Sequence, residues 1–308
     1  MSRTVNGEHL FDDVAKEVLR KQCWQIAEYC GLQLVTYAIL ANHFHVLVRV
    51  PRIAAVGDAE LLRRYQLLYP RPTRHRTQRI EVVRQQLAAD HPEAAVWRRR
   101  QLAMMGDISP FMKLLKQRFS IWFNQTHQRF GTLWSERFKS VLVEPRGRAV
   151  EAVAAYVDLN AVRAGWVDDP KDYRFCGYAE AVAGGSAAQQ GINSLFSLPW
   201  RASQAGYRQI LFGTGVHSRA GRHLMPYAAV QEALQAGGQL PLATVLRCRV
   251  RYFSDGAVLG SRAFVARQLA HYHRHTGWRT RASPRPLPSV TRWTGLCTLR
   301  TLRQNAFG

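Results

Sequence analysis

Apolar residues are densest around residues 38–50, where two mostly apolar runs flank a short Ala-Asn break. Such runs on both sides of a break predict a hairpin of two buried strands. Side chains alternate along a strand, so His43 and His45 point to one face and Phe44 to the other, into a core. Two neutral imidazoles on one strand face can share a divalent cation, although two ordinary hydrogen-bonded histidines would give the same pattern.

A second pattern, with helical spacing, occupies residues 150–165. Tyr156, Asn160 and Arg163 stand at i, i+4 and i+7, so a phenol, a carboxamide and a guanidinium project from one face. Gly165 suits a left-handed C-terminal cap. On its own, this helix is equally compatible with an ordinary polar flank. The neighbouring apolar stripe contains Val150, Val153, Ala154, Val157 and Ala161.

Helical spacing also predicts an amphipathic helix over residues 12–30, closed by Gly31. A further helix is expected over residues 111–124, with Ser109 as its N-cap and Pro110 in its first turn. Its aromatic residues favour a core over a base-stacking platform. The core candidates of the first helix are Val14, Val18 and Ile26.

Residues 133–144 are expected to form a strand that carries Arg137 and Lys139 on one face. Before it, residues 52–106 are rich in arginine and include the run Arg98-Arg99-Arg100. A charge run is often only a solvated face, but here contact with nucleic-acid phosphates is the favoured interpretation. Tyr65, Tyr69 and Trp97 of the same segment are compatible with base stacking and with a core.

Composition narrows the class of protein. The 308 residues are 47% hydrophobic, which predicts a folded core rather than disorder. Lys and Arg number 43 against 21 Asp and Glu, a net charge of +22 that is typical of a protein that neutralises phosphates. The five cysteines are scattered, without metal-site spacing, which predicts reduced thiols. No apolar run approaches the ~18 residues of a membrane span, so we expect a cytoplasmic protein.

Several blocks together resemble a known family. The His43-Phe44-His45 motif and the segment 155–165 are similar to the histidine motif and the tyrosine helix of the single-tyrosine HUH transposases. More narrowly, they resemble the REP-associated tyrosine transposases. Residues 131–140 and 172–178 are similar to two further blocks of that family and occur in the same order. The resemblance covers roughly residues 1–180.

The resemblance implies a role for each matching residue. His43 and His45 match the two metal-binding histidines, Asn160 matches the third ligand position and Tyr156 matches the nucleophile. The metal would be Mg²⁺ or Mn²⁺, and the substrate single-stranded or hairpin DNA. The expected products are a 5′-phosphotyrosine adduct and a 3′-hydroxyl, which allow religation without ATP. Candidate DNA contacts are Arg137, Lys139, Arg163, Arg98, Arg99 and Arg100.

The implied fold class is α+β. Residues 1–182 would form a ferredoxin-like or RRM-like antiparallel sheet with helices on one face, interrupted by the arginine-rich insertion at 52–106. Residues 1–10 are polar and turn-like, whereas family members usually carry a strand upstream of the equivalent of Arg3-Thr4, so we expect the first strand to be missing. The glycine-rich segment 183–191 is expected to be a linker.

Residues 192–308 are expected to form a basic, mainly helical accessory region with an extended tail, because nine arginines and no acidic residue follow Asp255. The helix after Asp255-Gly256 is compatible with a helix-turn-helix arrangement. The helices are expected at 203–212, 227–236, 242–253 and 261–275.

Three hypotheses follow from these observations. The leading one is a metal-dependent DNA endonuclease and strand transferase, acting as a monomer or homodimer near the nucleoid. The second is a catalytically silent nucleic-acid-binding protein on the same scaffold. The third, a metallohydrolase, is disfavoured because residues 46–50 supply no further carboxylate or imidazole.

Overall fold

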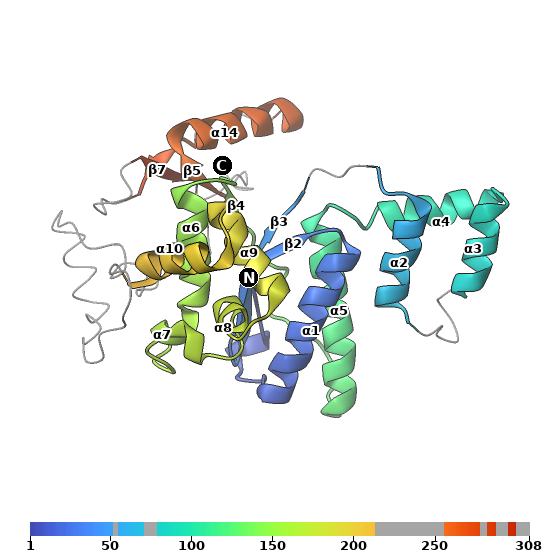
Figure 1. Ribbon diagram of the computed structural model, residues 1–308, viewed down its shortest axis with the longest axis horizontal. Helices are drawn as coiled ribbons and strands as arrows, with labels where there is room; N and C mark the ends of the chain where they lie inside the picture. Colours follow the sequence, from blue (N-terminus) through green and yellow to red (C-terminus); the bar gives the residue numbers. More distant parts are fainter. Residues whose placement is uncertain (52–54, 71–78, 213–255, 278–281, 288–294, 300–308) are drawn as a thin grey trace. The chain divides into compact units, whose positions relative to one another are not determined.

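The structure is a computed structural model that describes residues 1–51, 55–70, 79–212, 256–277, 282–287 and 295–299 (Figure 1). The chain divides into two compact units. The first contains residues 1–3, 35–47 and 136–308, and the second contains residues 4–34 and 48–135. Among the described residues, no helix is both long enough and apolar enough to cross a membrane.

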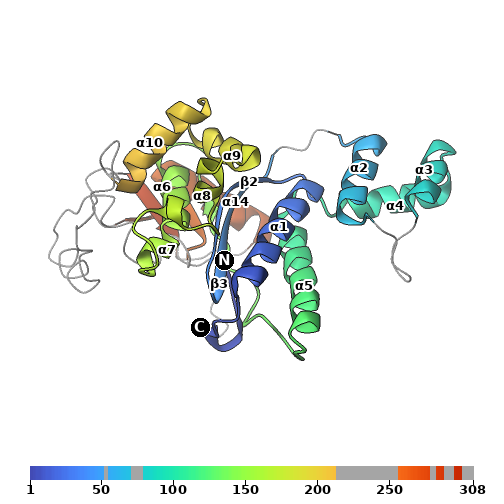
Figure 2. The same cartoon turned by 60° about the horizontal axis from the view of Figure 1, so that its bottom comes forward.

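The second unit is built on two long helices, α1 (Asp13–Tyr29) and α5 (Ile108–Thr126), which pack together (Figure 2). The predicted first helix is confirmed, with the Asp12 carboxylate accepting a bond from the Ala15 amide at 2.7 Å. Ile26 is buried, but Val14 is 63% exposed, so its assignment to the core was wrong. A short 3-10 turn, η1 (Val5–Gly7), precedes α1.

The start of α5 differs from the prediction. Asp107, not Ser109, is the N-cap, because its carboxylate accepts a bond from the Ser109 amide at 2.7 Å. The expected aromatic core of this helix is confirmed: Phe119 packs edge-on against Phe11, with ring centroids 5.3 Å apart. Pro110 lies within the first turn, as expected.

The arginine-rich segment forms three helices, α2 (Asp58–Leu68), α3 (Ile80–Ala88) and α4 (Pro92–Leu102). They enclose a small core of their own. Tyr65 and Trp97 belong to that core, which decides between the two interpretations left open by the sequence. The buried members are Leu61, Tyr65, Val83, Trp97 and Met105.

The first unit contains a three-stranded sheet in the order β1 (Ser2–Arg3), β3 (His43–Arg49), β2 (Gln33–Ile39). The hairpin of β2 and β3 is as predicted. Residues 1–10 are not simply turn-like, however, because β1 pairs antiparallel with β3, with Arg3 opposite His43. The expectation that residues 1–10 are turn-like is therefore corrected at Ser2 and Arg3, which form a short strand at this edge.

Helices cover this sheet in the first unit. The predicted tyrosine helix divides into α6 (Arg148–Asp158) and α7 (Asn160–Arg163). After the 3-10 turn η2 (Pro170–Asp172) come α8 (Gly177–Val182), α9 (Ser186–Phe196) and α10 (Trp200–Phe212).

The expected linker at 183–191 is corrected, because most of it is the first part of α9. Glycine and alanine are small enough to let α9 pack closely against α8 and α10, so a glycine-rich composition marks a helix contact here rather than a flexible link. Helix α10 in turn packs against α6.

A second sheet combines a strand that precedes α6 with three strands from the C-terminal part of the chain. Its order is β4 (Leu142–Val143), β5 (Val258–Ser261), β7 (Leu296–Leu299) and β6 (Arg285–Pro286). The predicted strand 133–144 is reduced to β4. The described part of the basic C-terminal region is mostly helical, as predicted, and it also supplies the strands β5, β6 and β7.

Helix α14 (Arg262–Thr276) directly follows β5 and packs on this sheet. This arrangement contradicts a helix-turn-helix, in which a second helix would precede it across a tight turn. The helices expected at 227–236 and 242–253 lie outside the described residues. The α+β class is confirmed.

Candidate active site

The two histidines of β3 lie together, with ring centroids 5.3 Å apart. Both come from the central strand of the sheet, where side chains two residues apart share a face. His45 is buried and His43 is half-buried. The predicted pairing of the imidazoles is therefore present.

The neighbouring Asn42 fixes the tautomer of His43. Its side-chain oxygen lies 2.7 Å from His43 Nδ1. An amide oxygen can only accept a hydrogen bond, so the ring proton resides on Nδ1 and the lone pair resides on Nε2. A carbonyl oxygen bound to one ring nitrogen is the usual companion of a metal-binding histidine.

Burial keeps His45 neutral. Loss of solvent lowers the pKa of His45 well below its ordinary value, and nearby positive groups, among them His43, Arg163 and Arg3, lower this pKa further. A neutral imidazole has a nitrogen lone pair to offer to a ligand. The same positive surroundings favour a bound anion.

Tyr156 lies beside the histidines. The centroids of the Tyr156 and His45 rings are 6.1 Å apart, with the rings nearly perpendicular. Helix α6 carries the tyrosine, and its predicted apolar stripe is buried throughout. The phenol is only 3% exposed. The two sequence patterns, far apart along the chain, thus meet in one place.

Asn160 and Arg163 hold the backbone of the same helix. Asn160 Nδ2 donates to the carbonyl oxygens of Tyr156, at 3.2 Å, and Val157, at 2.9 Å. These bonds use the amide nitrogen and leave the side-chain oxygen as the atom of Asn160 that could bind a cation. Gly165, with φ of 72°, ends the helix as predicted.

The guanidinium of Arg163 covers the nucleophile candidate. Its carbon lies 3.9 Å from the centroid of the Tyr156 ring, and its Nη2 donates to the Tyr156 carbonyl at 2.7 Å. A cation stacked on an aromatic face is attracted by the negative charge of that face. The predicted common face of Tyr156, Asn160 and Arg163 is thus real, and it contains direct contacts.

Sequence reasoning missed the group that anchors this helix, Asp158. Its carboxylate is fully buried and accepts bonds from the Thr36 hydroxyl at 2.7 Å, the Tyr178 amide at 3.2 Å and the Tyr207 hydroxyl at 2.5 Å. Burial raises the pKa of Asp158 to about 7, against the lowering effect of these donors. The available signal was an acidic residue that directly follows the apolar run of residues 152–157.

The predicted DNA contacts differ in their surroundings. Arg137 and Lys139 are exposed, and Lys139 forms an ion pair with Glu136 at 3.3 Å. In the second unit, Arg98 makes a two-point ion pair with Asp58, with nitrogen–oxygen distances of 2.6 and 2.7 Å. Arg99 and Arg100 are exposed. Among the six basic candidates, Arg163 contacts Tyr156 directly.

The donor set for a cation would be two imidazoles and one carboxamide oxygen. In the described part of the chain, no group of three His, Cys, Asp or Glu side chains is arranged to hold a metal ion. The cysteines that the structure describes are free and buried. Any cation at this site would therefore depend on His43, His45 and Asn160, and on oxygens of a bound substrate.

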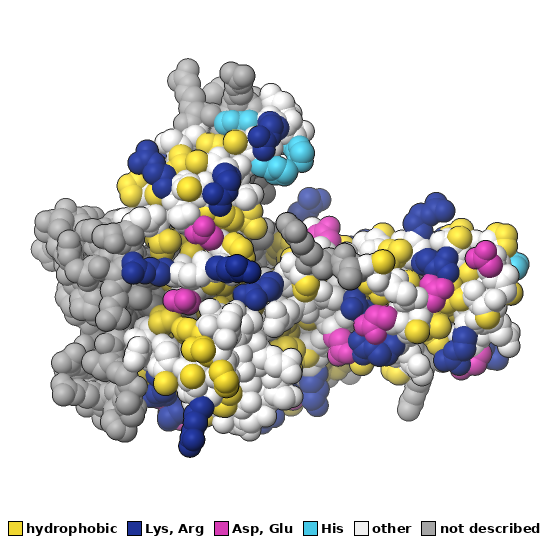
Figure 3. All heavy atoms as spheres, turned by 45° about the horizontal axis from the view of Figure 1, so that its top comes forward, with side chains coloured by type: hydrophobic (Ala, Val, Ile, Leu, Met, Phe, Trp, Pro, Cys, Tyr) yellow, Lys and Arg dark blue, Asp and Glu magenta, His cyan; other side chains and the backbone are white. Residues whose placement is uncertain are grey.

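A separate basic surface lies on α14. Arg267, His271 and Arg274 stand at i, i+4 and i+7 on its exposed face. Figure 3 shows Lys or Arg side chains in blue beside His side chains in cyan at the top of the view, where α14 lies. Exposed alanines lie along one side of this stripe, so that side of the helix carries only short side chains. The flanking residues are Ala263, Ala266 and Ala270.

Comparison with known proteins gave no relatives: no family model matches the chain, and no curated protein or solved structure is similar to it.

Proposed function

We propose that this protein is a metal-dependent single-stranded DNA endonuclease and strand transferase, acting at hairpin-containing, REP-like DNA through a 5′-phosphotyrosine intermediate. The observation that carries the proposal is the 6.1 Å separation of the His45 and Tyr156 rings. A binding protein has no need of a phenol packed between a histidine pair and an arginine. The motif resemblance and the net charge of +22 point in the same direction.

In fold terms, we propose an HUH domain of the ferredoxin-like or RRM-like kind. The order β1-β3-β2 places the histidine strand at the centre of its sheet. The tyrosine helix lies close enough to that strand for the His45 and Tyr156 rings to meet edge-on. These two features are the ones that such a domain requires.

The residues present fit a divalent cation such as Mg²⁺ or Mn²⁺. His43 and His45 would hold it through ring nitrogens, and Asn160 through its side-chain oxygen. A bound cation would polarise a non-bridging oxygen of the scissile phosphate. The neutral state of His45 and the Nδ1–H tautomer of His43 suit this role.

The reaction that Tyr156 would perform is a balanced exchange of phosphoester bonds. Its phenolic oxygen, having lost its proton, attacks phosphorus, and the bond from phosphorus to the 3′ oxygen of the neighbouring nucleotide breaks. The departing oxygen takes up a proton and becomes the 3′-hydroxyl. Attack of a 3′-hydroxyl on the phosphotyrosine reverses the exchange and joins strands, releasing the tyrosine.

Arg163 would change partners when DNA binds. In the structure its guanidinium covers a phenol that is only 3% exposed. A phosphodiester offers this guanidinium a charged, bidentate partner that is stronger than an aromatic face. Moving Arg163 to the phosphate would uncover Tyr156 and place positive charge beside the reacting group.

The α14 stripe would give the DNA a second contact. Its exposed arginines can reach phosphates while the flanking alanines allow the helix to approach closely. This fits contact with the backbone of a hairpin stem. A cytoplasmic, nucleoid-associated protein acting as a monomer or homodimer is part of the same proposal.

One observation favours the alternative, a catalytically silent nucleic-acid-binding protein. Tyr156 is buried beneath Arg163, and a protein that never reacted could keep it there as packing. The two functions differ in one product, because only the enzyme forms a covalent link to DNA.

The test is covalent adduct formation. Purified protein is incubated with labelled single-stranded hairpin DNA and Mg²⁺ or Mn²⁺, then separated on a denaturing protein gel. We expect a metal-dependent labelled band that Tyr156→Phe abolishes and that Tyr272→Phe, a tyrosine of α14, leaves intact. Binding of the DNA without any adduct from the native sequence would favour the silent alternative.

A further inference from the structure

The nucleophile candidate sits on a helix that is anchored from its opposite side. Asp158 follows Tyr156 by two residues, so the two side chains leave α6 in nearly opposite directions. The phenol faces His45, whereas the carboxylate faces Thr36 of β2. Strand β2 is hydrogen-bonded to the histidine strand, so the Asp158–Thr36 bond ties the tyrosine helix to the sheet that carries the histidines.

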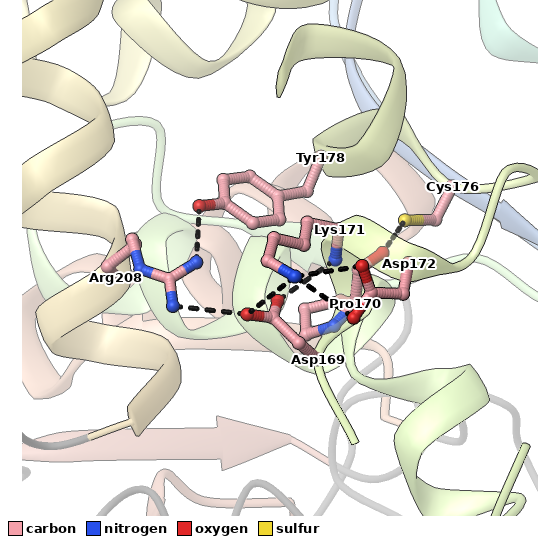
Figure 4. A network of polar contacts seen from close by, with 7 residues as sticks. All are labelled: Asp169, Pro170, Lys171, Asp172, Cys176, Tyr178 and Arg208. Atoms are coloured by element: carbon pink, nitrogen blue, oxygen red, sulfur yellow. Dashed lines mark hydrogen bonds and ion pairs between the residues drawn. The ribbon is translucent and has the colours of Figure 1, made fainter. Parts of the chain in front are cut away.

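Helix α10 supplies the second half of this anchor. The Tyr207 hydroxyl donates to the other oxygen of the Asp158 carboxylate at 2.5 Å, and Tyr207 is fully buried. The next residue, Arg208, donates to Asp169 at 3.1 Å and to the Tyr178 hydroxyl at 3.2 Å. Figure 4 shows Arg208 reaching from α10 to both partners.

The fit around this anchor is close. A β-carbon added to Gly177, at the start of α8, would overlap the Thr36 hydroxyl. The amide of the next residue, Tyr178, donates to the same carboxylate oxygen that Thr36 uses. Three elements outside α6, namely β2, α8 and α10, thus converge on one buried carboxylate.

A carboxylate is a costly choice for stability alone. Removing a carboxylate from water is unfavourable, and an apolar residue of similar size often stabilises a core as well or better. A carboxylate that accepts several hydrogen bonds adds a defined geometry, since each hydrogen bond fixes a distance and an angle. This favours a role in fixing the position of α6 over a role in packing.

We propose that Asp158 is a positioning residue, and that α10, acting through Tyr207, is required to hold Tyr156 at the histidine pair. The inference rests on the proposed function for its catalytic consequence. It extends that function beyond the segment that resembles the transposase family, because α10 lies after residue 182.

The test compares three variants of the full chain: Asp158→Ala, Asp158→Asn and Tyr207→Phe. We expect Asp158→Ala and Tyr207→Phe to slow adduct formation at saturating DNA by at least about tenfold. The DNA concentration that gives half-maximal rate should change by less than about twofold, because neither side chain faces the proposed DNA contacts. Asp158→Asn, which can still bond to Thr36 and Tyr207, should restore the rate to within about threefold.

Thr298→Val is the matched control. Thr298 is buried in the second sheet of the same unit, and its hydroxyl donates to the Val258 carbonyl at 3.1 Å. This variant also loses a buried hydrogen bond, so a general loss of stability would slow it equally. An equal slowing of Thr298→Val, or a native rate in Asp158→Ala, would overturn the positioning role.

Hydrogen exchange separates this inference from the proposed function. In Tyr207→Phe, amides of α6 should exchange at least about tenfold faster than in the native sequence, while those of β5 stay unchanged. Unchanged exchange in α6 would overturn the anchor even if adducts form. If the native protein forms no adduct, the proposed function fails, and the exchange rates still decide whether α10 anchors α6.

Discussion

Two helical regions of this protein use polar residues in opposite ways. Around α6 and α7, Asp158 and Asn160 are buried and each hydrogen bond has a defined donor and acceptor. In α2 to α4, arginines form ion pairs at the surface, as in Arg63 with Glu60 and Arg98 with Asp58. Buried bonds fix a geometry, whereas exposed pairs are easily exchanged with water or with another anion. The first region is therefore suited to positioning reacting groups and the second to adaptable contact.

The two regions should differ most in how far a substitution lowers the free energy of unfolding. Asp158→Ala should lower the free energy of unfolding by about 2–4 kcal/mol, because it leaves the Thr36, Tyr178 and Tyr207 donors buried without their acceptor. Arg98→Ala, which breaks a surface pair whose side chains are 33% and 38% exposed, should change it by less than about 1 kcal/mol. Urea unfolding followed by circular dichroism measures both, and equal losses would remove the contrast.

A pH dependence should accompany the buried carboxylate. The pKa of Asp158 is raised to about 7 in the folded protein, whereas an unfolded aspartate titrates near ~3.9. The folded state therefore holds more protons between these values, so this group makes the free energy of unfolding fall as pH rises from about 4 to about 7.

Comparing the native protein with Asp158→Asn isolates the contribution of Asp158 titration to the free energy of unfolding, which is on the order of a few kcal/mol. The lowered pKa of His45 acts in the opposite direction, since its contribution is lost as pH falls below ~6.5, but both proteins share it. Urea unfolding at several pH values should show the difference between them widening across the window. Parallel curves would contradict a buried Asp158 with a raised pKa.

A smaller effect is expected at Arg163. Lysine cannot stack on the Tyr156 ring and bond to its carbonyl as the planar guanidinium does. Arg163→Lys should therefore slow adduct formation at saturating DNA by about tenfold. Arg174→Lys, an exposed arginine that lies near the Phe175 ring, is the control and should react at the native rate. Equal rates for the two variants would remove Arg163 from the site.

On α14 the expected effect is on DNA binding rather than on the rate of adduct formation. Replacing Arg267 and Arg274 with glutamine should weaken binding to a hairpin stem by about tenfold at low salt. The slope of log affinity against log salt concentration should fall by about 1.8, which corresponds to two lost phosphate contacts. The control replaces Lys21 and Arg201, two exposed basic residues outside the proposed DNA contacts, with glutamine. Fluorescence anisotropy measures both, and unchanged slopes would exclude α14 from the interface.

The sequence was sufficient for features that depend on local spacing. The strand periodicity placed His43 and His45 on one face, and the helical periodicity placed Tyr156, Asn160 and Arg163 on another. Both rest on side-chain directions that the backbone dictates within a few residues. The α+β class follows from the same patterns.

What the sequence could not provide depends on contacts between distant residues. The bond from Tyr207 to Asp158 joins positions 49 apart, and that from Thr36 joins positions 122 apart. The glycine-rich start of α9 has the composition of a linker, and composition does not distinguish flexibility from close helix packing. The short strands β4 to β7 depend on their pairing across the sheet, which no local sequence pattern indicates.

The most direct test of the central claim is to locate the covalent bond to DNA. The adduct formed with a defined hairpin is digested with trypsin and a nuclease, and its peptides are analysed by tandem mass spectrometry. We expect a nucleotide attached through its 5′ phosphate to Tyr156, within the peptide spanning residues 149–163, and no modified peptide when the metal is chelated. Attachment to another residue, or strand cleavage with no modified tyrosine, would contradict the account.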